Sequence, residues 1–242
     1  MTSSLTVPPD AEGLAAAAGA LRAGRLVVIP TDTVYGVAAD PANPEAVGRL
    51  FAAKQRPREL AIPVLVGGLE QAELLAADIS PAARWLMDAF WPGGLTVVLV
   101  TNPDLAWDLG DKPGTIAVRQ PDHPAALELF KATGPLAVTS ANVSGHLPAL
   151  TAAAARSQLG DHVAVYVDAG QAPGGTPSTV VDATDPAALP RIVREGAVAR
   201  RRLEAALRYA AGHPVTQPHL IWQQAAPPAS GAQPGDGQGP GA

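Results

Sequence analysis

The chain has 242 residues, no cysteine and a formal net charge of −5, and 47% of its residues are hydrophobic. This apolar content suffices for a buried core and excludes a chain that is disordered throughout. The lack of cysteine excludes a disulfide scaffold, a thiolate zinc site and a cysteine nucleophile. The negative charge argues against a protein that coats nucleic acid non-specifically. The 24 glycines and 25 prolines form an unusually large share of the chain.

Helix-start signals and short apolar runs alternate along the chain, which predicts an α/β domain with a twisted, mixed β-sheet flanked by helices. We expect helices over residues 11–23, 44–53, 81–91, 122–132 and 199–211, and a short helix capped by Thr151. We expect strands over residues 26–30, 62–66, 95–100, 115–119, 136–139, 163–168, 178–182 and 190–194.

The chain ends are poor in structural signals. Eighteen of the twenty residues 223–242 are Ala, Gly, Pro or Gln, so we expect a folded domain over residues 1–212 and a disordered tail over 213–242.

The sequence also bears on the location of the protein. The first basic residue is Arg22, which does not fit a secretion signal and favours the cytoplasm. The uncharged stretch 132–155 contains Gly, Pro and Asn, so we interpret it as strand and loop rather than a membrane helix.

Short polar side chains follow two of the predicted strands. PTDTVYG, residues 30–36, follows the first strand and includes Thr33, and TSANVSG, residues 139–145, includes Ser140 and Asn142. Ligands of open α/β sheets bind at strand ends, and hydroxyls and amides can donate to phosphate or carboxylate oxygens. The alternative is that these side chains only satisfy the backbone of turns.

Three cations occur within five residues in KQRPR, namely Lys54, Arg56 and Arg58. Arginine and lysine both suit a phosphate; alternatively, they form a solvated end that complements a helix dipole. Arg119 and Arg194 each end an apolar strand, where an arginine needs an anionic partner, either a ligand or an aspartate of the protein. The pair Gly174-Gly175 permits a close backbone approach to a ligand.

Seven segments in this order resemble the YrdC-like threonylcarbamoyl-AMP synthases over about residues 14–200: PTDTVYG, KQRP, FWPGGLTVVL, TIAVRQPDHP, TSANVSG, PSTVVD and RIVREG. The resemblance implies the YrdC-like fold with an open, positively charged cavity, in the short, single-domain form. It implies that L-threonine, bicarbonate or CO₂, and ATP give threonylcarbamoyl-AMP and pyrophosphate. It further implies Mg²⁺ bound with ATP through phosphates and water, and downstream proteins that transfer the threonylcarbamoyl group to tRNA.

The resemblance also assigns roles to particular side chains. The threonine contacts fall on Thr33, Arg119 and Ser178. The ATP contacts fall on Lys54, Arg56, Thr115, Ser140, Asn142 and Arg194, of which Lys54 and Arg56 are the expected catalytic cations. In-line attack on a phosphate needs positioning and charge neutralisation more than proton transfer.

The chain departs from the family pattern at two places. Leu60-Ala61 stands where relatives show Lys or Asn followed by Pro-Leu, and HLPALT, residues 146–151, replaces a shorter Ser-Pro-Thr type of segment. The polar contact expected near Leu60 and the hydroxyl expected near Ala149 are therefore missing.

Two other functions compete with the synthase. The hydrogenase-maturation carbamoyltransferases contain a similar domain, but they are longer chains with zinc fingers that need cysteine. An RNA-binding module is the second alternative, although the acidic balance and the few aromatic residues weigh against strong RNA affinity. A basic surface of Lys54, Arg56, Arg58 and residues 200–202 leaves room for a weak tRNA contact.

Overall fold

A computed structural model describes residues 4–212, which form a single ten-stranded sheet. The strands are β1 (Leu5–Val7), β2 (Leu26–Ile29), β3 (Gly36–Ala39), β4 (Val64–Leu65), β5 (Leu95–Val100), β6 (Thr115–Arg119), β7 (Leu136–Ser140), β8 (Val163–Val167), β9 (Thr179–Asp182) and β10 (Arg191–Arg194). Their order is β1-β8-β2-β3-β7-β4-β6-β5-β9-β10. Parallel and antiparallel pairs both occur, for example β4 with β6 and β5 with β6, so the prediction of a mixed sheet is confirmed.

Seven α-helices connect these strands within the described residues: α1 (Ala11–Arg22), α2 (Pro44–Lys54), α3 (Leu69–Leu75), α4 (Pro81–Phe90), α5 (Pro124–Thr133), α6 (Ala152–Leu159) and α7 (Arg200–Gly212). The side chains of Asn43, Ser80 and Thr151 cap α2, α4 and α6 by accepting from backbone N–H groups three residues later. Such caps satisfy donors that a helix start leaves unpaired, and the predicted helix starts there are confirmed.

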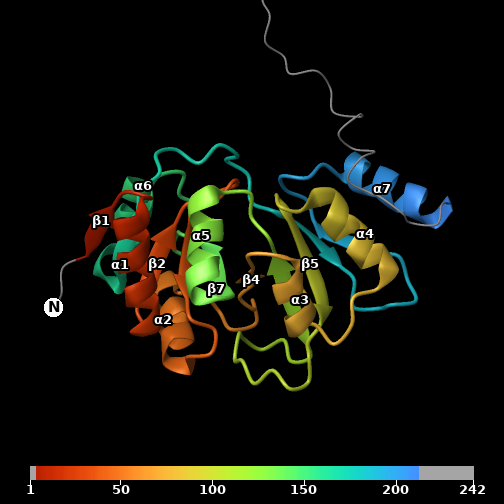
Figure 1. The fold of residues 1–242 in the computed structure, drawn as a ribbon, viewed down its shortest axis with the longest axis horizontal. Helices are drawn as coiled ribbons and strands as arrows, with labels where there is room; N and C mark the ends of the chain where they lie inside the picture. The colour runs from red at the N-terminus through yellow and green to blue at the C-terminus, as the bar shows by residue number, and fades with distance from the viewer. Residues whose placement is uncertain (1–3, 213–242) are drawn as a thin grey trace, which may run out of the picture.

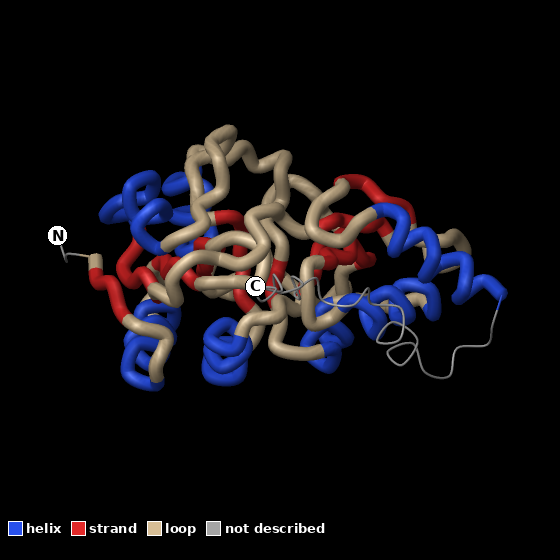
Figure 2. Tube along the Cα trace, turned by 90° about the horizontal axis from the view of Figure 1, so that it is seen from above, coloured by secondary structure: helices blue, strands red, loops and turns tan. Residues whose placement is uncertain are grey.

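The two halves of the sheet are covered differently. Around β2, β3, β7 and β8, one apolar cluster joins the sheet to α1 and α5, and another joins it to α2 and α6. Around β4, β5, β6 and β9, a third cluster joins the sheet to α3, α4 and α7. Figure 1 shows α1, α5, α3 and α4 in front of the sheet, and Figure 2 shows loops over the middle of the opposite side. Within residues 4–212, one face of the second half therefore has no helical cover.

Side-chain alternation on β6 marks that uncovered face. Ile116 and Val118 are buried against the helices, whereas Thr115 and Ala117 are more exposed. Because successive side chains of a strand point to opposite faces, Thr115, Ala117 and Arg119 share the uncovered face. A strand rises about 3.3 Å per residue, so this row is about 13 Å long.

The sequence does not predict β1, β3 or α3. β3 reads GVAA and pairs with β7 through a close approach, since a Cβ on Gly36 would lie 2.6 Å from a methyl carbon of Val138. The glycine and alanines of β3 have low β-propensity, and they occur in this strand because the neighbouring strand approaches closely. The strand is therefore not visible from propensity. β1 has three residues, and α3 has seven with no side-chain cap. Residues 213–242, predicted to be a tail, lie outside the described residues. No helix within residues 4–212 combines the length and the apolar character that crossing a membrane requires.

Candidate functional site

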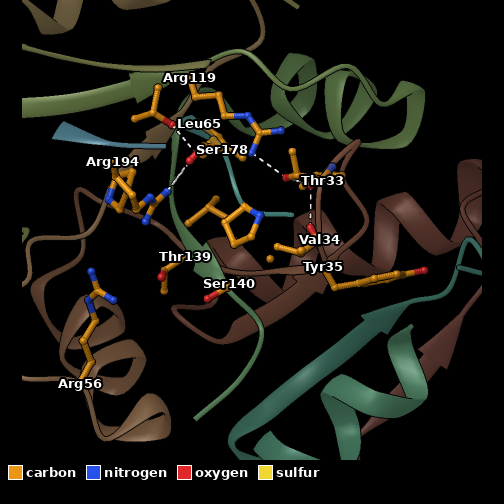
Figure 3. Close-up of a pocket in the computed structure, with 16 residues that line it drawn as sticks. Thr33, Val34, Tyr35, Arg56, Leu65, Arg119, Thr139, Ser140, Ser178 and Arg194 are labelled. Atoms are coloured by element: carbon orange, nitrogen blue, oxygen red, sulfur yellow. Dashed lines mark hydrogen bonds between the residues drawn. The ribbon is translucent and has the colours of Figure 1, made fainter. Parts of the chain in front are cut away.

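A cavity of about 150 Å³ opens where the two halves of the sheet meet, because β3 and β7 line it together with β4, β5 and β6, and we call it the first cavity. Figure 3 shows its labelled side chains converging from several elements. It is lined by Thr31, Thr33, Val34, Tyr35, Gly36, Arg56, Pro63, Leu65, Thr96, Arg119, Val138, Thr139, Ser140, Pro177, Ser178 and Arg194. This set brings together six of the predicted site residues: Thr33, Arg56, Arg119, Ser140, Ser178 and Arg194.

Arg119 ends β6 and is 6% exposed. Its Nε donates to the carbonyl oxygen of Gly93 at 2.9 Å, its Nη1 donates to Oγ1 of Thr33 at 2.9 Å, and its Nη2 donates to the Asp32 carboxylate. Burial lowers the pKa of Arg119, and the nearby Asp32 carboxylate opposes that shift. The anionic partner that the sequence left open is thus an aspartate of the protein, while the guanidinium still lines the cavity.

Thr33 is held by a compact turn. The hydroxyl of Thr31 donates to the carbonyl oxygen of Val34 at 2.6 Å, and Oγ1 of Thr31 lies 3.1 Å from Oγ1 of Thr33. The Gly174-Gly175 loop packs on this turn: Gly175 N donates to Thr33 O at 2.8 Å, and a Cβ on Gly174 would lie 2.5 Å from Asp32 O. The glycine pair therefore permits a close approach to the protein's own backbone, rather than to a ligand as the sequence suggests.

Ser178 lines the first cavity just before β9, and Figure 3 shows it between Arg119 and Arg194. Its Oγ is 2.8 Å from Oγ1 of Thr96 on β5, and both residues are buried. Arg194, the last residue of β10, donates from Nη2 to the carbonyl oxygen of Ser178 at 2.8 Å and to its Oγ at 3.3 Å. The sequence motifs do not single out Thr96, although it is the polar member of the run LTVVLV.

Arg56 follows α2 after Gln55, a non-glycine residue with a φ of 50°. This left-handed residue ends the helix and turns the chain toward the cavity. The Nε of Arg56 donates to Leu60 O at 2.7 Å, and its Nη2 donates to Ala61 O at 3.1 Å. Burial lowers the pKa of Arg56, and the positive charge of Arg194 lowers it further. The two arginines face a common space, which favours an anion between them.

Lys54 does not line the first cavity. It is 1% exposed, and its Nζ donates to Asn142 O at 2.6 Å and also to Ser140 O. Its own carbonyl accepts from Ser144 N at 2.8 Å. Burial, and to a lesser degree the charge of Arg56, lowers the pKa of Lys54 to about 7. The buried lysine therefore fixes the loop of residues 140–144 through hydrogen bonds to its backbone.

Asn142 and Thr115 also lie outside the first cavity. The side-chain amide of Asn142 donates to Val143 O and His146 O, both at 2.9 Å, and its Oδ1 is buried without a partner. Thr115 lines a second cavity of about 350 Å³, which is bordered by Ala61, Trp107 and Ala117 among others. The second cavity lies further along the same face of β6 as Arg119.

The two departures from the family pattern have structural explanations. Leu60 is 53% exposed, and what this segment offers is the backbone oxygens of Leu60 and Ala61, which Arg56 binds. Ala149 is buried, and its carbonyl oxygen accepts from Tyr35 N at 3.0 Å. Neither segment brings a side-chain hydroxyl or amide to the first cavity.

A family model for Sua5, YciO and YrdC, described as telomere recombination, matches residues 19–196. The chain belongs to this Sua5/YciO/YrdC family. Over 191 residues it is 51% identical to a putative threonylcarbamoyl-AMP synthase of Mycobacterium tuberculosis, covering 79% of this chain and 87% of that protein. It is 36% identical to the threonylcarbamoyl-AMP synthase of Bacillus subtilis, covering 80% of this chain and 56% of the relative.

Solved structures of the Sua5/YciO/YrdC family share this fold. Sua5 of Pyrococcus abyssi complexed with L-threonine superposes with a TM-score of 0.78 at 32% identity, covering 85% of this chain and 60% of that one. YciO of Escherichia coli gives a TM-score of 0.71 at 26% identity, covering 81% of this chain and 96% of that one. The predicted YrdC-like α/β fold is thus confirmed.

Carboxylates are scarce at this site. Within residues 4–212, no Asp or Glu lines the first cavity, and no cluster of three His, Asp or Glu side chains suited to a metal occurs. The carboxylate of Asp32 borders the cavity arginine Arg119 and accepts a hydrogen bond from it through Oδ1. The described side chains therefore do not form a magnesium site of their own.

Proposed function

We infer that this member of the Sua5/YciO/YrdC family is a threonylcarbamoyl-AMP synthase, a nucleotidyltransferase that forms threonylcarbamoyl-AMP and pyrophosphate from L-threonine, bicarbonate or CO₂, and ATP. The observation that carries this proposal is the first cavity, in which three arginines face buried hydroxyls with no carboxylate among the lining residues of the described chain. Such a lining suits two anionic substrates at once. The relatives named threonylcarbamoyl-AMP synthase and the Sua5 complex with L-threonine support the same activity.

We assign L-threonine to the part of the first cavity between Thr33, Arg119 and Ser178. A guanidinium has five N–H donors, and three of those on Arg119 bind protein groups. One N–H on each terminal nitrogen is left for the substrate carboxylate. The hydroxyls of Thr33 and Ser178 can bind the amino and hydroxyl groups of the same substrate.

We assign the phosphates of ATP to Arg56 and Arg194, with Ser140 beside them. On the uncovered face of β6, the row from Arg119 in the first cavity to Thr115 in the second cavity is about 13 Å long by strand rise, and this length suits a nucleotide. Lys54 and Asn142 serve this subsite through the loop that they hold, because the Lys54 Nζ reaches only backbone oxygens of that loop in the described contacts.

The reaction needs little acid–base chemistry from the protein. The amine nitrogen of threonine bonds to the carbon of CO₂ and gives a carbamate, and the amine proton passes to solvent. With bicarbonate, the same N–C bond forms while a C–O bond breaks, and the departing hydroxyl leaves as water with the amine proton. A carbamate oxygen then attacks the α-phosphorus of ATP, the bond to the β-phosphate bridging oxygen breaks, and pyrophosphate leaves. Arg56 and Arg194 would neutralise the charge that develops on the phosphates, and Arg119 would orient threonine. Mg²⁺ would accompany ATP, held by phosphate oxygens and water.

The product is a reactive mixed anhydride, so its use requires downstream proteins that transfer the threonylcarbamoyl group to tRNA in the cytoplasm. Direct RNA binding has less support. Lys54 is buried, Arg58 pairs with Asp108 and Asp111, and Arg200 pairs with Glu195. These contacts neutralise much of the basic surface that the sequence offers for a weak tRNA contact.

Pyrophosphate release measured with purified full chain, Mg²⁺ and ATP tests the proposal. We expect release only when both L-threonine and bicarbonate are present, and threonylcarbamoyl-AMP as the co-product by mass spectrometry. Reactions without threonine, or with L-valine in its place, serve as controls, because L-valine keeps the carboxylate and removes the hydroxyl. Pyrophosphate release that ignores threonine would overturn the assignment.

A further inference from the structure

Asp32 lies next to the first cavity without lining it. It follows β2 in the segment PTDTVYG, and its side chain is 16% exposed. Its Oδ1 accepts two hydrogen bonds, one from Nη2 of Arg119 and one from the backbone N of Asp122 at 3.0 Å. The carboxylate thus touches a cavity-lining side chain from behind.

We propose that Asp32 is a positioning residue that fixes the Arg119 guanidinium in the orientation needed to bind the carboxylate of threonine. The proposal rests on the function proposed above. It assigns no substrate contact to Asp32, because that residue does not belong to the cavity lining.

The first argument is geometric. A guanidinium is planar, so its orientation is fixed once acceptors bind three of its nitrogens. Gly93 O binds Nε, Thr33 Oγ1 binds Nη1 and Asp32 binds Nη2. Of these acceptors, Asp32 is the ionised one, and a charge-assisted hydrogen bond is about twice as strong as a neutral one.

The second argument concerns what holds Asp32. Its backbone belongs to the turn against which the Gly174-Gly175 loop packs, and the Asp32 carbonyl leaves no space for a Cβ on Gly174. Its carboxylate also binds the backbone N of Asp122, three residues after Arg119. Asp32 therefore links the Arg119 side chain to the chain segment that leaves β6. A residue with such contacts fixes the orientation of a binding side chain and does not itself contact the substrate.

Two other roles for Asp32 fit less well. A metal ligand would need further ligating side chains beside it, and within residues 4–212 Asp32 belongs to no group of three His, Asp or Glu side chains suited to a metal. A general base for the threonine amine would need to face the substrate, and Asp32 lies outside the lining of the first cavity. Both alternatives predict loss of turnover, whereas positioning predicts loss of threonine affinity first.

Steady-state kinetics of three variants test the proposal. In Asp32→Ala the KM for threonine should rise about 10- to 100-fold, the worth of one charged hydrogen bond, while the KM for ATP stays within about twofold. Asp32→Asn keeps an oxygen acceptor of the same reach, so its threonine KM should rise by less than that of Asp32→Ala. Glu73→Gln is the matched control, because Glu73 binds Arg84 on the surface away from the cavity, and it should behave as the unmodified chain.

A double-mutant cycle separates positioning from a general loss of structure. If Asp32 acts through Arg119, Asp32→Ala should add little to the threonine KM when Arg119→Ala is already present. Full additivity, an equal rise in both KM values, or an unchanged threonine KM in Asp32→Ala would overturn the inference. If Asp32→Ala does not fold, the same cycle is run with Asp32→Asn. The unmodified chain is assayed in parallel, and its failure to release pyrophosphate would overturn the proposed function instead.

Discussion

The two sides of the first cavity hold their arginines in different ways. On one side, Arg119 donates to groups from two segments far from it in the sequence, namely the turn with Asp32 and Thr33, and Gly93. On the other side, Arg56 donates to the carbonyl oxygens of Leu60 and Ala61, four and five residues further along its own loop. The first side chain is positioned by the tertiary fold, whereas the position of the second follows that of one loop.

This difference suits the two proposed substrates. Threonine is a small ligand that a rigid set of donors can select, because a preorganised site has little ordering cost on binding. The triphosphate of ATP changes its charge distribution as pyrophosphate leaves. A cation on a loop can follow that change, since loops move more easily than the strands they connect.

Removing Arg119 should have the largest effect. In Arg119→Ala we expect kcat/KM for threonine to fall about 100-fold, or about 2.7 kcal/mol, with a much smaller change for ATP. Asp32 would also lose its cationic partner, so the free energy of unfolding should fall by about 3 kcal/mol. Steady-state kinetics with each substrate varied, together with urea unfolding, measure both effects. A larger loss for ATP than for threonine would mean that the two subsites are exchanged.

Removing Arg56 should have the next largest effect and should fall on ATP. In Arg56→Ala we expect pyrophosphate release to slow about 30-fold, because one of the cations facing the phosphates is lost, while stability changes by about 1 kcal/mol. Arg58→Ala is the matched control from the same loop, since Arg58 pairs with Asp108 and Asp111 and lies over the Phe51 ring. If Arg58→Ala slowed release as much as Arg56→Ala, the loop as a whole rather than the Arg56 charge would be responsible.

The sequence predicts the strands other than β1 and β3 and the helices other than α3, because apolar runs and capping residues are local signals. It also predicts which loops meet at the cavity. It does not predict the surroundings of Lys54 and Asp32, because their hydrogen-bond partners lie more than 80 residues away, backbone oxygens for Lys54 and the Arg119 side chain for Asp32. Lys54 and Arg56 are two residues apart in KQRPR, but Gln55 between them has a left-handed backbone conformation. As a result, Lys54 binds the 140–144 loop, whereas Arg56 lines the first cavity.

Lys54 offers a sharper test of this contrast. In Lys54→Met the buried oxygens of Ser140 and Asn142 lose their donor, so the free energy of unfolding should fall by about 2 kcal/mol. Pyrophosphate release should fall about tenfold at most, since the loop loosens but the cavity arginines remain. Unfolding midpoints and turnover measured on the same preparations check both. If turnover vanished while stability stayed the same, Lys54 would contact the substrate directly, as the family resemblance implies.

The smallest expected effect is a pH dependence of stability that Lys54 carries. Burial lowers its pKa to about 7 from the ordinary value of 10.5. Between these values the unfolded chain binds more protons than the folded one, so the unfolding free energy rises with pH.

Relative to Lys54→Met, the unmodified chain should therefore gain about 1 kcal/mol per pH unit between pH 8 and 9, and little below pH 6. Urea unfolding at pH 6, 7, 8 and 9 measures this difference, with Lys131→Met as the control because Lys131 is exposed and paired with Glu128. A neutral amine still has two N–H groups for the two carbonyl oxygens, so the hold on the 140–144 loop should persist through this titration. A stability difference that does not change with pH would show that Lys54 stays charged in its buried position.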